Sequence, residues 1–444
     1  MDNISDLMSN GLELLKESDA DLAFVLELEQ KRQQEQLVLV ASSSIVPPSA
    51  LYTQCTAAVN VTAEGYPGAR YHAGCINVDK IEQLAIDRAK NLFKAQYANV
   101  QAHSASSANL CLISSILQPG ETLLGMDISS GGHLTHGASV SFSGKCFNAV
   151  SYHTIENGII DYDEVAYLAK KHKPKLIICG TTAYSREVDF ERFHNIAMEV
   201  KAYLLADISH VAGLIAAGVH PSPIDLAHFT TACTHKQLYG PRGALILGGQ
   251  LTKKSKSPNE DMPLENYIQK AIFPYFQGAP KMNQIAAIAH SLKLNSTKEF
   301  KQIASDIKQN ATFLAEGLKK KGYKIVSQGT DTHIVLVDLI NKNLTGYVVE
   351  KALEKCNIIV NRNRVPGDTT AAFVSRGIRF GTNTLAYRGF TKDSIDQCIE
   401  LFDKVVCNIN QISDKEYEIS EDFTQFVKKE IRILTSRHPI PNYF

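Results

Sequence analysis

The chain has 444 residues, of which 44% are hydrophobic and 21% charged, as in an ordinary globular protein. Lysine plus arginine and aspartate plus glutamate number 46 each, so no overall charge indicates a nucleic-acid or membrane partner, and a small-molecule ligand is expected. The nine cysteines form no Cys-x-x-Cys pair, which argues against a disulfide framework or a metal site. With no secretory signal and no membrane-length apolar stretch, we expect a cytoplasmic protein.

The first part of the chain predicts a helical arm. Residues 2–17 and 20–36 are expected to form two helices, with Asp19 or Asp21 as the cap of the second. Four apolar residues give the second helix a hydrophobic stripe: Leu22, Val25, Leu26 and Leu28. Such a stripe packs either on a partner subunit or on its own chain, and the sequence leaves both open. A short strand is expected at residues 37–41.

Strands and helices alternate from about residue 95 to residue 250. The expected strands include residues 121–127, 173–180 and 202–207, and the expected helices include 78–96, 104–117 and 189–200. This alternation predicts an α/β fold with a mainly parallel sheet covered by helices on both faces. In such sheets, ligands bind beyond the carboxyl ends of the strands.

Lys236 lies between an apolar strand-like run and a Gly-Pro-Arg-Gly turn. A lysine in a turn is usually a solvated surface charge, but here a second group accompanies it. Asp207 ends a predicted buried strand 29 residues earlier, a separation that allows one helical crossover between neighbouring parallel strands. Thr182 follows the end of another predicted strand. A pyridoxal phosphate enzyme requires a lysine that forms a Schiff base and a carboxylate that keeps the pyridine nitrogen protonated.

Three further segments contain residues suited to a site. Small hydroxyl residues at 104–109 open a predicted helix and suit a phosphate, although such serines are more often ordinary helix caps. At 131–137, two glycines precede His133 and allow the backbone to approach a planar group. Residues 63–75 form a glycine-rich irregular segment that contains an acid, an arginine and two aromatic residues, a composition common in binding sites.

The last third of the chain predicts a second domain of α+β type. A polar loop at 253–263 and a long amphipathic helix at 297–321 precede expected strands at 333–337, 358–360 and 377–380. Arg379 falls in the middle of the last of these, where a carboxylate contact would offset its burial. A partly exposed arginine on an edge strand is the alternative. We therefore expect a helical arm at 1–50, a large domain at 51–296 and a small domain at 297–444.

Five motifs in order closely resemble the serine (glycine) hydroxymethyltransferases. They are Ala-Glu-Gly-Tyr-Pro-Gly at 63–68, Gly-Gly-His-Leu-Thr-His-Gly at 131–137, Thr-His-Lys at 234–236, Phe-Pro-x-x-Gln-Gly at 273–278 and Gly-Ile-Arg-x-Gly-Thr at 377–382. The resemblance covers nearly the whole chain. It implies a fold-type-I pyridoxal phosphate enzyme with an aminotransferase-like large domain, a smaller α+β domain and an N-terminal helical arm. It also implies a homodimer with shared active sites, or a tetramer.

The resemblance assigns cofactor contacts and catalytic groups. Lys236 corresponds to the Schiff-base lysine, Asp207 to the partner of the pyridine nitrogen and His133 to the histidine that stacks on the ring. His210 and Thr182 correspond to contacts near the cofactor O3′, and His235 precedes the lysine as in the family. The phosphate would be held by Ser104, Ala105 and Ser106, together with Gly278 of the neighbouring subunit.

The resemblance also implies substrate and folate contacts. Arg379 and Ser42 would bind the substrate carboxylate, with His72 beside them. Glu64 corresponds to the acid–base glutamate that reaches the neighbouring subunit's site and contacts folate. The other folate contacts would be Ile128, Gly132, Leu134 and Asn363.

The chain is a divergent member, because several rim positions differ from the family pattern. The departures are Thr62, His72, Ala73, Ser43, Ser44, Ser107, Ser130, Ala279 and Asn283. Thr62 and His72 stand where the family has tyrosines that help to position the cofactor and close over the carboxylate. Their loss is expected to weaken that closure, although His72 adds a titratable donor that could replace one tyrosine.

Three functions follow from this pattern. The leading one is interconversion of serine and glycine in one-carbon metabolism, with pyridoxal 5′-phosphate as cofactor and tetrahydrofolate as one-carbon carrier. Retention of Glu64, Leu134 and Asn363 favours it. The rim departures favour a folate-independent aldolase or transaldolase, or a hydroxymethyltransferase for another β-hydroxy amino acid. A catalytically weak paralogue kept for binding or regulation is the third, and the intact Lys236 and Asp207 argue against it.

Overall fold

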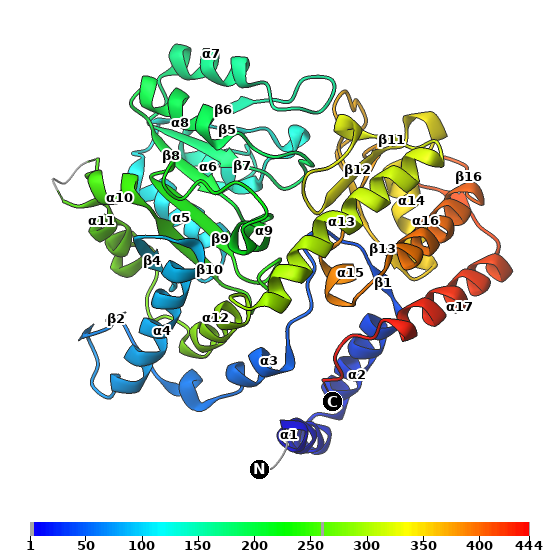
Figure 1. Ribbon diagram of the computed structural model, residues 1–444, viewed down its shortest axis with the longest axis horizontal. Coiled ribbons are helices and arrows are strands. Elements are labelled where there is room, and N and C mark those ends of the chain that lie inside the picture. Colours follow the sequence, from blue (N-terminus) through cyan, green and yellow to red (C-terminus); the bar gives the residue numbers. More distant parts are fainter. Residues whose placement is uncertain (1–3, 259–261, 444) are drawn as a thin grey trace.

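A seven-stranded sheet forms the centre of the larger domain in the computed structural model, which describes residues 4–258 and 262–443 (Figure 1). Its strand order is β4-β10-β9-β8-β7-β5-β6. The strands are β4 (Tyr97–Asn99), β5 (Thr122–Met126), β6 (Asn148–Tyr152), β7 (Leu176–Gly180), β8 (Tyr203–Asp207), β9 (Phe229–Cys233) and β10 (Ala244–Gly248). β10 runs antiparallel to β4 and β9, whereas the pairs from β9 across to β6 are parallel. The mainly parallel α/β sheet predicted from the sequence is confirmed.

Each face of this sheet packs against its own hydrophobic core. In β7, Ile177 and Cys179 belong to one core, whereas Leu176 and Ile178 belong to the other. The first core is covered by α4 (Ile76–Phe93), α7 (Tyr162–His172), α8 (Phe190–Glu199), α9 (Ala212–Ala217) and α12 (Met282–Leu294), and the second by α5 (Ala105–Ile116) and α11 (Leu264–Lys270). Burial of both faces explains the continuous apolar runs of β7 and β10.

The smaller domain has an antiparallel sheet of order β11-β12-β15-β14, with helices packed on it. Its strands are β11 (Lys324–Ile325), β12 (Ile334–Asp338), β14 (Asn361–Asn363) and β15 (Gly377–Gly381). Its helices are α13 (Lys298–Lys320), α14 (Gly346–Lys355), α15 (Asn383–Tyr387), α16 (Lys392–Cys407) and α17 (Glu421–Arg437), and a two-stranded ribbon joins β16 (Asn410–Gln411) to β17 (Tyr417–Glu418).

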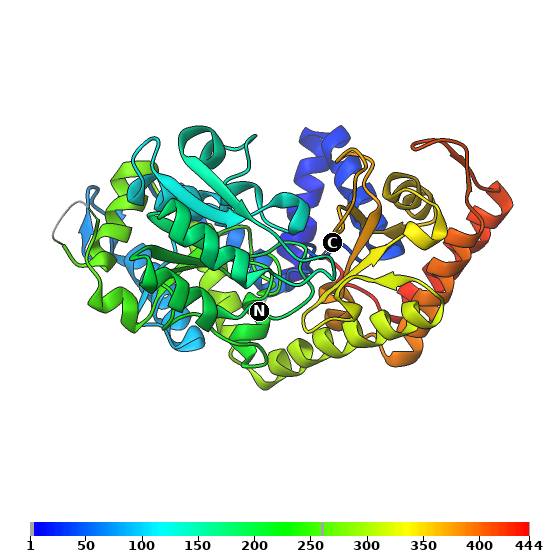
Figure 2. The ribbon, with the colours of Figure 1, turned by 90° about the horizontal axis from the view of Figure 1, so that it is seen from above.

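Helix α13 connects the two domains. Thr297 caps the helix by accepting a hydrogen bond from the Phe300 amide. The helix predicted at 297–321 is thus found with nearly the same bounds. Its first turns contribute Phe300 and Ile307 to the large-domain core, and its later turns contribute Leu314 and Leu318 to the small-domain core. Figure 2 shows the helix running along both lobes. A single helix therefore holds the lobes together at one side.

The arm begins with α1 (Ile4–Ser18) and α2 (Ala20–Glu35), and Asp19, rather than Asp21, caps α2. Residues 2 and 3 of the predicted first helix lie outside the described residues. The apolar stripe predicted on α2 is between 40% and 58% exposed at its four positions, and Ala23 is the buried residue of this helix. The arm therefore does not bury its stripe against the described part of its own chain.

The strand expected at 37–41 is shorter and lies in the small domain. β1 (Leu37–Val38) pairs in parallel with β13 (Ile358–Ile359). The Leu39 carbonyl accepts a hydrogen bond from the Gly381 amide at 2.7 Å, so the chain continues against β15 without forming a second ladder. The strand expected at 358–360 is found as β13, one residue shorter than expected, and a separate strand, β14, follows it and pairs with β15.

Other element boundaries differ from the expectations for local reasons. α4 ends at Phe93, earlier than the predicted residue 96, because Lys94 adopts a left-handed backbone with φ of 55°. The segment expected to be a polar loop at 253–263 starts within α10 (Gln250–Lys254) and contains a bridge between Lys256 and Pro263, while residues 259–261 lie outside the described residues. The remaining short helices are α3 (Pro48–Gln54) and α6 (Phe142–Cys146).

Arg388 joins the arm, the small domain and the C-terminal helix. Its guanidinium donates hydrogen bonds to the carbonyl oxygens of His438 at 2.5 Å, Gln36 at 3.2 Å and Thr435 at 3.1 Å. Arg432 also connects α17 to the arm, through an exposed ion pair with Glu35 at 3.4 Å. Both arginines therefore connect the C-terminal helix to the arm, Arg388 through buried hydrogen bonds and Arg432 through an exposed ion pair.

Replacing Arg388 with glutamine should destabilise the protein by about 2–4 kcal/mol, because it leaves buried carbonyl groups without donors. Arg432→Gln should cost less than about 1 kcal/mol, because exposed ion pairs contribute little. Urea unfolding of the two variants beside the parent protein measures the difference. Equal losses would contradict the assignment of Arg388 as the connecting group.

Candidate active site

The parallel strands bring four predicted site residues to one edge of the large-domain sheet. Asp207 is the last residue of β8, Thr182 follows β7, and Lys236 follows β9. His133 follows β5 and begins the short helix η3 (Leu134–His136). Because β5, β7, β8 and β9 are mutually parallel, their carboxyl ends meet at this edge. The location agrees with the expectation for an open α/β sheet.

Asp207 is a buried carboxylate held by three donors. Its Oδ2 accepts hydrogen bonds from Asn109 Nδ2 at 2.8 Å and from His136 Nε2 at 3.1 Å, and its Oδ1 accepts one from the Ser209 amide at 3.0 Å. Burial by itself would raise the pKa of Asp207, but the hydrogen bond and the charge of His136 outweigh it and hold the pKa well below its usual range. The carboxylate therefore stays ionised inside the protein.

Sequence reasoning did not assign Asn109 and His136 to the site. His136 is the second histidine of the motif at 131–137, and Asn109 lies on the buried side of α5. The cluster of His133, His136 and Asp207 places potential metal-ligand atoms within 4.8 Å of one another. Two of these residues are already joined by the His136–Asp207 hydrogen bond, and His133 Nδ1 accepts one from the Thr135 amide at 3.2 Å. These bonds make the cluster an internal hydrogen-bonded network.

The amine of Lys236 is half-buried, and none of the described residues forms an ion pair or hydrogen bond with it. Its charge acts on its neighbours. Burial first, and then the Lys236 charge, hold the pKa of His210 well below its ordinary value. Burial first, then His136, lower the pKa of His133 to about 4. A lysine amine without a counter-ion next to two neutral histidines is suited to covalent attachment of a carbonyl group.

His210 also contacts a histidine from the small domain. The rings of His210 and His333 are stacked with centroids 5.5 Å apart, and His210 Nδ1 lies 3.3 Å from His333 Nε2. Burial lowers the pKa of His333 to about 3, so both rings are neutral and one donates a hydrogen bond to the other. His333 was expected only as a strand residue. It connects β12 with the edge of the large-domain sheet.

The N-terminus of α5 can hold a phosphate. Ser104 caps the helix, and its Oγ accepts a hydrogen bond from the Ser107 amide at 3.1 Å. The amides of Ala105 and Ser106 have no acceptor among the described residues. Free amides and the positive end of the helix dipole favour an anion at this position. The three residues predicted to contact the phosphate are thus placed together.

Gly131 and Gly132 let two loops approach each other closely. Gly131 has φ of 105°, and a Cβ there would lie 2.7 Å from the Ala183 carbonyl oxygen. A Cβ at Gly132 would overlap the Met126 carbonyl oxygen. Thr182 fixes the contact, because its amide donates to the Gly131 carbonyl at 2.7 Å and its hydroxyl donates to the Gly132 carbonyl at 2.9 Å. The predicted cofactor contact Thr182 thus also binds the loop that carries His133.

Arg379 reaches this edge from the small domain. β15 lies between β12 and β14, so the alternative of an exposed edge-strand arginine is excluded. Arg379 Nε donates to Asn361 Oδ1 at 3.0 Å and Nη1 donates to the Thr182 carbonyl at 2.5 Å. Burial lowers the pKa of Arg379 to about 10, and no carboxylate in the described part of the chain pairs with it. A half-buried guanidinium without a counter-ion is suited to a ligand carboxylate.

Glu64, His72 and Gly278 form a separate group. Glu64 and His72 flank the hairpin of β2 (Gly65–Tyr66) and β3 (Ala69–Arg70), and Glu64 Oε2 lies 3.3 Å from His72 Nε2. A Cβ at Gly278 would lie 3.5 Å from Glu64 Oε1. Among residues 4–258 and 262–443, no hydrogen bond or ion pair connects this group with Lys236, Asp207 or Arg379.

The remaining predicted residues have no hydrogen bond to Lys236, Asp207 or Arg379 among the described residues. Ile128 and Leu134 are 40% and 51% exposed, and Asn363 in β14 donates to the Arg364 carbonyl at 2.6 Å. Ser42 is half-buried and lines a cavity of about 450 Å³ together with His235 and Arg242. His235 Nε2 lies 3.3 Å from Arg242 Nη1, and its Nδ1 is buried without a partner among the described residues. Burial lowers the pKa of His235 to about 4.

These observations fit a phosphorylated pyridine aldehyde. Lys236 offers an amine without a counter-ion, Asp207 offers an ionised carboxylate for a ring nitrogen, and the α5 N-terminus offers free amides for a phosphate. Arg379 offers a cation for the carboxylate of an amino acid. The donors therefore match both pyridoxal 5′-phosphate and its amino-acid substrate.

The family comparison agrees with this fit. A family model described as serine hydroxymethyltransferase matches residues 15–402, which is most of the chain and includes every predicted site residue. The match begins at Leu15, near the end of α1, covers the whole large domain and ends at Phe402, within α16 of the small domain. The chain therefore belongs to the serine hydroxymethyltransferase family of pyridoxal-phosphate-dependent transferases, as its sequence motifs and its fold-type-I architecture indicate.

Proposed function

We propose that the protein interconverts serine and glycine, with tetrahydrofolate as the one-carbon carrier. The observation that carries this proposal is a set of three groups at one edge of the sheet: the Lys236 amine and the ionised Asp207 after neighbouring strands, and the Arg379 guanidinium, which donates to the Thr182 carbonyl there and has no carboxylate partner in the described chain. Together they suit an α-amino acid held on a pyridine ring. The exposed side chains of Ile128 and Leu134 beside the His133 loop offer apolar surface for a pterin.

The residues would divide the cofactor work as follows. Pyridoxal 5′-phosphate, when bound, supplies a ring that accepts the electron pair released at the substrate Cα. Lys236 would hold this group through its amine until an amino-acid amine takes its place. Asp207 keeps a proton on the ring nitrogen, since its own pKa lies far below neutrality. His133 would pack against the ring, His210 and Thr182 would bind the cofactor oxygen near O3′, and Ser104, Ala105 and Ser106 would hold the phosphate.

A second set of residues would handle the substrate. Arg379, with Ser42, binds the carboxylate and thereby orients the bonds to Cα relative to the ring. Glu64 exchanges a proton with the substrate hydroxyl, because it is a solvent-accessible carboxylate at the rim with a histidine beside it. Gly132 and Asn363 complete the folate contacts.

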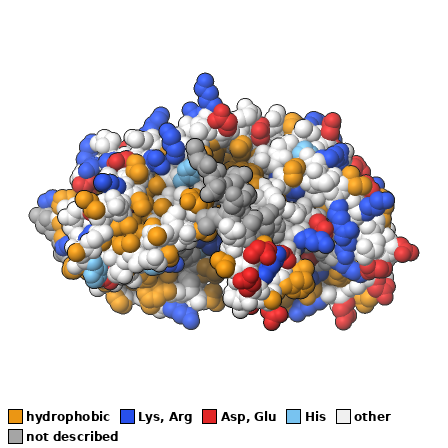
Figure 3. All heavy atoms as spheres, turned by 90° about the horizontal axis from the view of Figure 1, so that it is seen from below, with side chains coloured by type: hydrophobic (Ala, Val, Ile, Leu, Met, Phe, Trp, Pro, Cys, Tyr) orange, Lys and Arg blue, Asp and Glu red, His pale blue; other side chains and the backbone are white. Residues whose placement is uncertain are grey.

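We further propose a homodimer with shared active sites, with a tetramer as a possible higher assembly. Within the described residues, no hydrogen bond or ion pair joins Glu64 or Gly278 to the Lys236 cluster of their own chain, and we propose that a second subunit brings them to its site. Exposed apolar side chains are available for this contact on the arm and near the hairpin: Phe24 60%, Val25 58%, Val59 62%, Tyr71 73% and Ile76 71%. Figure 3 shows hydrophobic side chains spread over the large-domain half of one face. Such surfaces mark protein interfaces.

A cytoplasmic location is part of the proposal. The nine cysteines are free thiols in the structure, as is usual in a reducing compartment. Among the described helices, none combines the length and the apolar character needed to cross a bilayer.

The rim supports one alternative. His72 lies 3.3 Å from Glu64, so the proposed acid–base carboxylate has an imidazole neighbour in place of the family's tyrosine. This contact favours a folate-independent aldolase or transaldolase, or a hydroxymethyltransferase for a different β-hydroxy amino acid.

Glycine release from serine should depend strictly on tetrahydrofolate in the cofactor-loaded protein, because the carrier removes the one-carbon unit. The assay compares serine with and without tetrahydrofolate, with threonine and phenylserine as parallel substrates. Folate-indifferent cleavage of the bulkier substrates with serine inert would establish the alternative. A loaded protein that turns over none of them would indicate a binding or regulatory paralogue.

Mixing two inactive variants should restore activity if the sites are shared. Lys236→Ala lacks the lysine and Glu64→Gln lacks the acid–base group, but a mixed dimer rebuilds one complete site from both subunits. Equal mixing after reversible dissociation should recover about a quarter of the parent activity if subunits exchange at random. Recovery no greater than the sum of the separate variants would show that Glu64 acts within its own subunit.

A further inference from the structure

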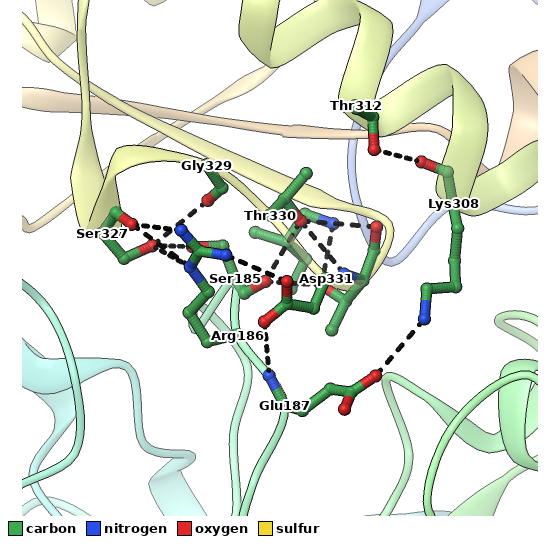
Figure 4. Close-up of polar contacts among 11 residues, drawn as sticks. Ser185, Arg186, Glu187, Lys308, Thr312, Ser327, Gly329, Thr330 and Asp331 are labelled. Atoms are coloured by element: carbon green, nitrogen blue, oxygen red, sulfur yellow. Dashed lines mark hydrogen bonds and ion pairs between the residues drawn. The ribbon is translucent and has the colours of Figure 1, made fainter.

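The loop after β7 is joined to the small domain at a second place besides Arg379. In this loop, Ser185, Arg186 and Glu187 meet the turn at residues 326–332, which leads into β12 (Figure 4). The Asp331 amide donates to the Ser185 carbonyl at 2.8 Å, and the hydroxyls of Ser185 and Ser327 lie 2.8 Å apart. The two segments therefore lie side by side, with Arg186 between them.

Arg186 makes most of this contact through its guanidinium. Nη2 donates to the Ser327 carbonyl at 2.5 Å, Nε donates to the same carbonyl at 3.2 Å, and Nη1 donates to Asp331 Oδ1 at 2.9 Å. The other oxygen of Asp331 accepts a hydrogen bond from the Glu187 amide at 3.3 Å. The planar, forked guanidinium reaches two points of the turn at once, which a lysine cannot do.

The turn that Arg186 holds has an unfavourable backbone. Ser327 and Gln328 both have positive φ, 57° and 61°, a conformation that costs energy in residues other than glycine. A Cβ at Gly329 would lie 3.2 Å from Arg186 Nη2, so the turn also approaches the arginine closely. Hydrogen bonds from Arg186 to the Ser327 carbonyl help to hold this conformation.

Both joined segments continue into the candidate active site. On the large-domain side, the loop carries Thr182, whose carbonyl accepts the hydrogen bond from Arg379. On the small-domain side, the turn leads through Thr332 to His333, which stacks on His210, and then into β12. β12 pairs with β15 in register Leu336 to Arg379. A shift of the turn would thus move Arg379 and His333 relative to Lys236.

We propose that Arg186 is a positioning residue for the substrate-carboxylate site. It docks the turn at 326–332 onto the loop after β7 and thereby fixes the Arg379 guanidinium against Thr182. The inference rests on the proposed function in one respect, namely that Arg379 binds the carboxylate. Because the side chains of Arg186 and Asp331 are 28% and 37% exposed, the ion pair contributes little to stability. Its proposed effect is to fix the position of the small domain relative to the large domain.

The same loop offers a matched control. Glu187 follows Arg186 and forms an ion pair with Lys308 of α13 at 3.3 Å, with side chains 40% and 30% exposed. This pair joins the same loop to α13, the helix that connects the two domains, but α13 carries neither Arg379 nor His333. Glu187→Gln keeps the backbone amide that donates to Asp331. It therefore tests for a general effect of weakening an interdomain ion pair.

The experiment compares Arg186→Gln, Arg186→Lys, Asp331→Asn and Glu187→Gln in the cofactor-loaded protein. Arg186→Gln should raise KM for serine on the order of tenfold with a smaller change in kcat, while the melting temperature and the cofactor absorbance stay close to those of the parent. Arg186→Lys should be intermediate, and Glu187→Gln should match the parent. Hydrogen exchange at the Asp331 amide should quicken in Arg186→Gln, since this amide bonds to Ser185.

Two results would overturn the inference. Faster exchange at Asp331 with an unchanged KM would show that Arg186 holds the turn without positioning Arg379. An equal rise of KM in Glu187→Gln would show that any loosening of the domains has this effect. If Arg186→Gln does not fold, Asp331→Asn removes the same ion pair from the other side. If the parent protein does not turn over serine, the proposed function fails. The inference is then tested by calorimetric binding of glycine, whose Kd should rise from parent to Arg186→Gln by the factor expected for KM.

Discussion

The buried charge of Asp207 is the constraint on which the site depends. A carboxylate in the interior is costly unless it is fully hydrogen-bonded, and Asp207 receives donors from three different segments. Asn109 extends the network, because its Nδ2 also donates to Thr135 Oγ1 at 3.0 Å and its Oδ1 accepts from Thr231 Oγ1 at 2.7 Å. One charged group thus fixes α5, the η3 loop, β8 and β9 relative to one another. The same elements carry the proposed phosphate, ring and lysine positions.

The second requirement is the relation between the two domains. The large domain supplies Lys236, Asp207 and the α5 N-terminus, the proposed lysine, ring and phosphate positions, whereas the small domain supplies Arg379 and His333. Helix α13 and its two cores hold the lobes at one side. The Arg379–Thr182 hydrogen bond and the Arg186 cluster add further contacts between the two domains. Arg379, the proposed carboxylate-binding group, lies on one domain and Lys236 lies on the other. Contacts between the domains are therefore needed to fix the distance between them.

The sequence predicted the features that local pattern determines. Continuous apolar runs predicted the parallel strands, and the positions of Asp207 and Lys236 after two of them placed both at one edge of the sheet. Long-range pairing could not be predicted in the same way. β1 joins a small-domain strand far along the chain, and nothing in Leu37–Val38 specifies that partner.

The missed site residues have a common origin. The residues that the sequence did not identify act through contacts with residues far away in sequence. Each has an ordinary local context: Asn109 lies in a helix interior, His136 in a short loop, His333 at a strand start and Arg186 in a turn. The apolar stripe of α2 has the opposite character, because its local pattern was recognised but its partner was not. Periodicity identified the apolar face, whereas the surface that covers it cannot be predicted from the pattern.

The most direct test of the account is to identify the lysine that holds the cofactor. Reduction of the loaded protein with borohydride, followed by proteolysis and mass spectrometry, fixes the cofactor to its lysine. The account predicts a single modified peptide that carries the group on Lys236. Modification of a different lysine, with Lys236 unmodified, would contradict it.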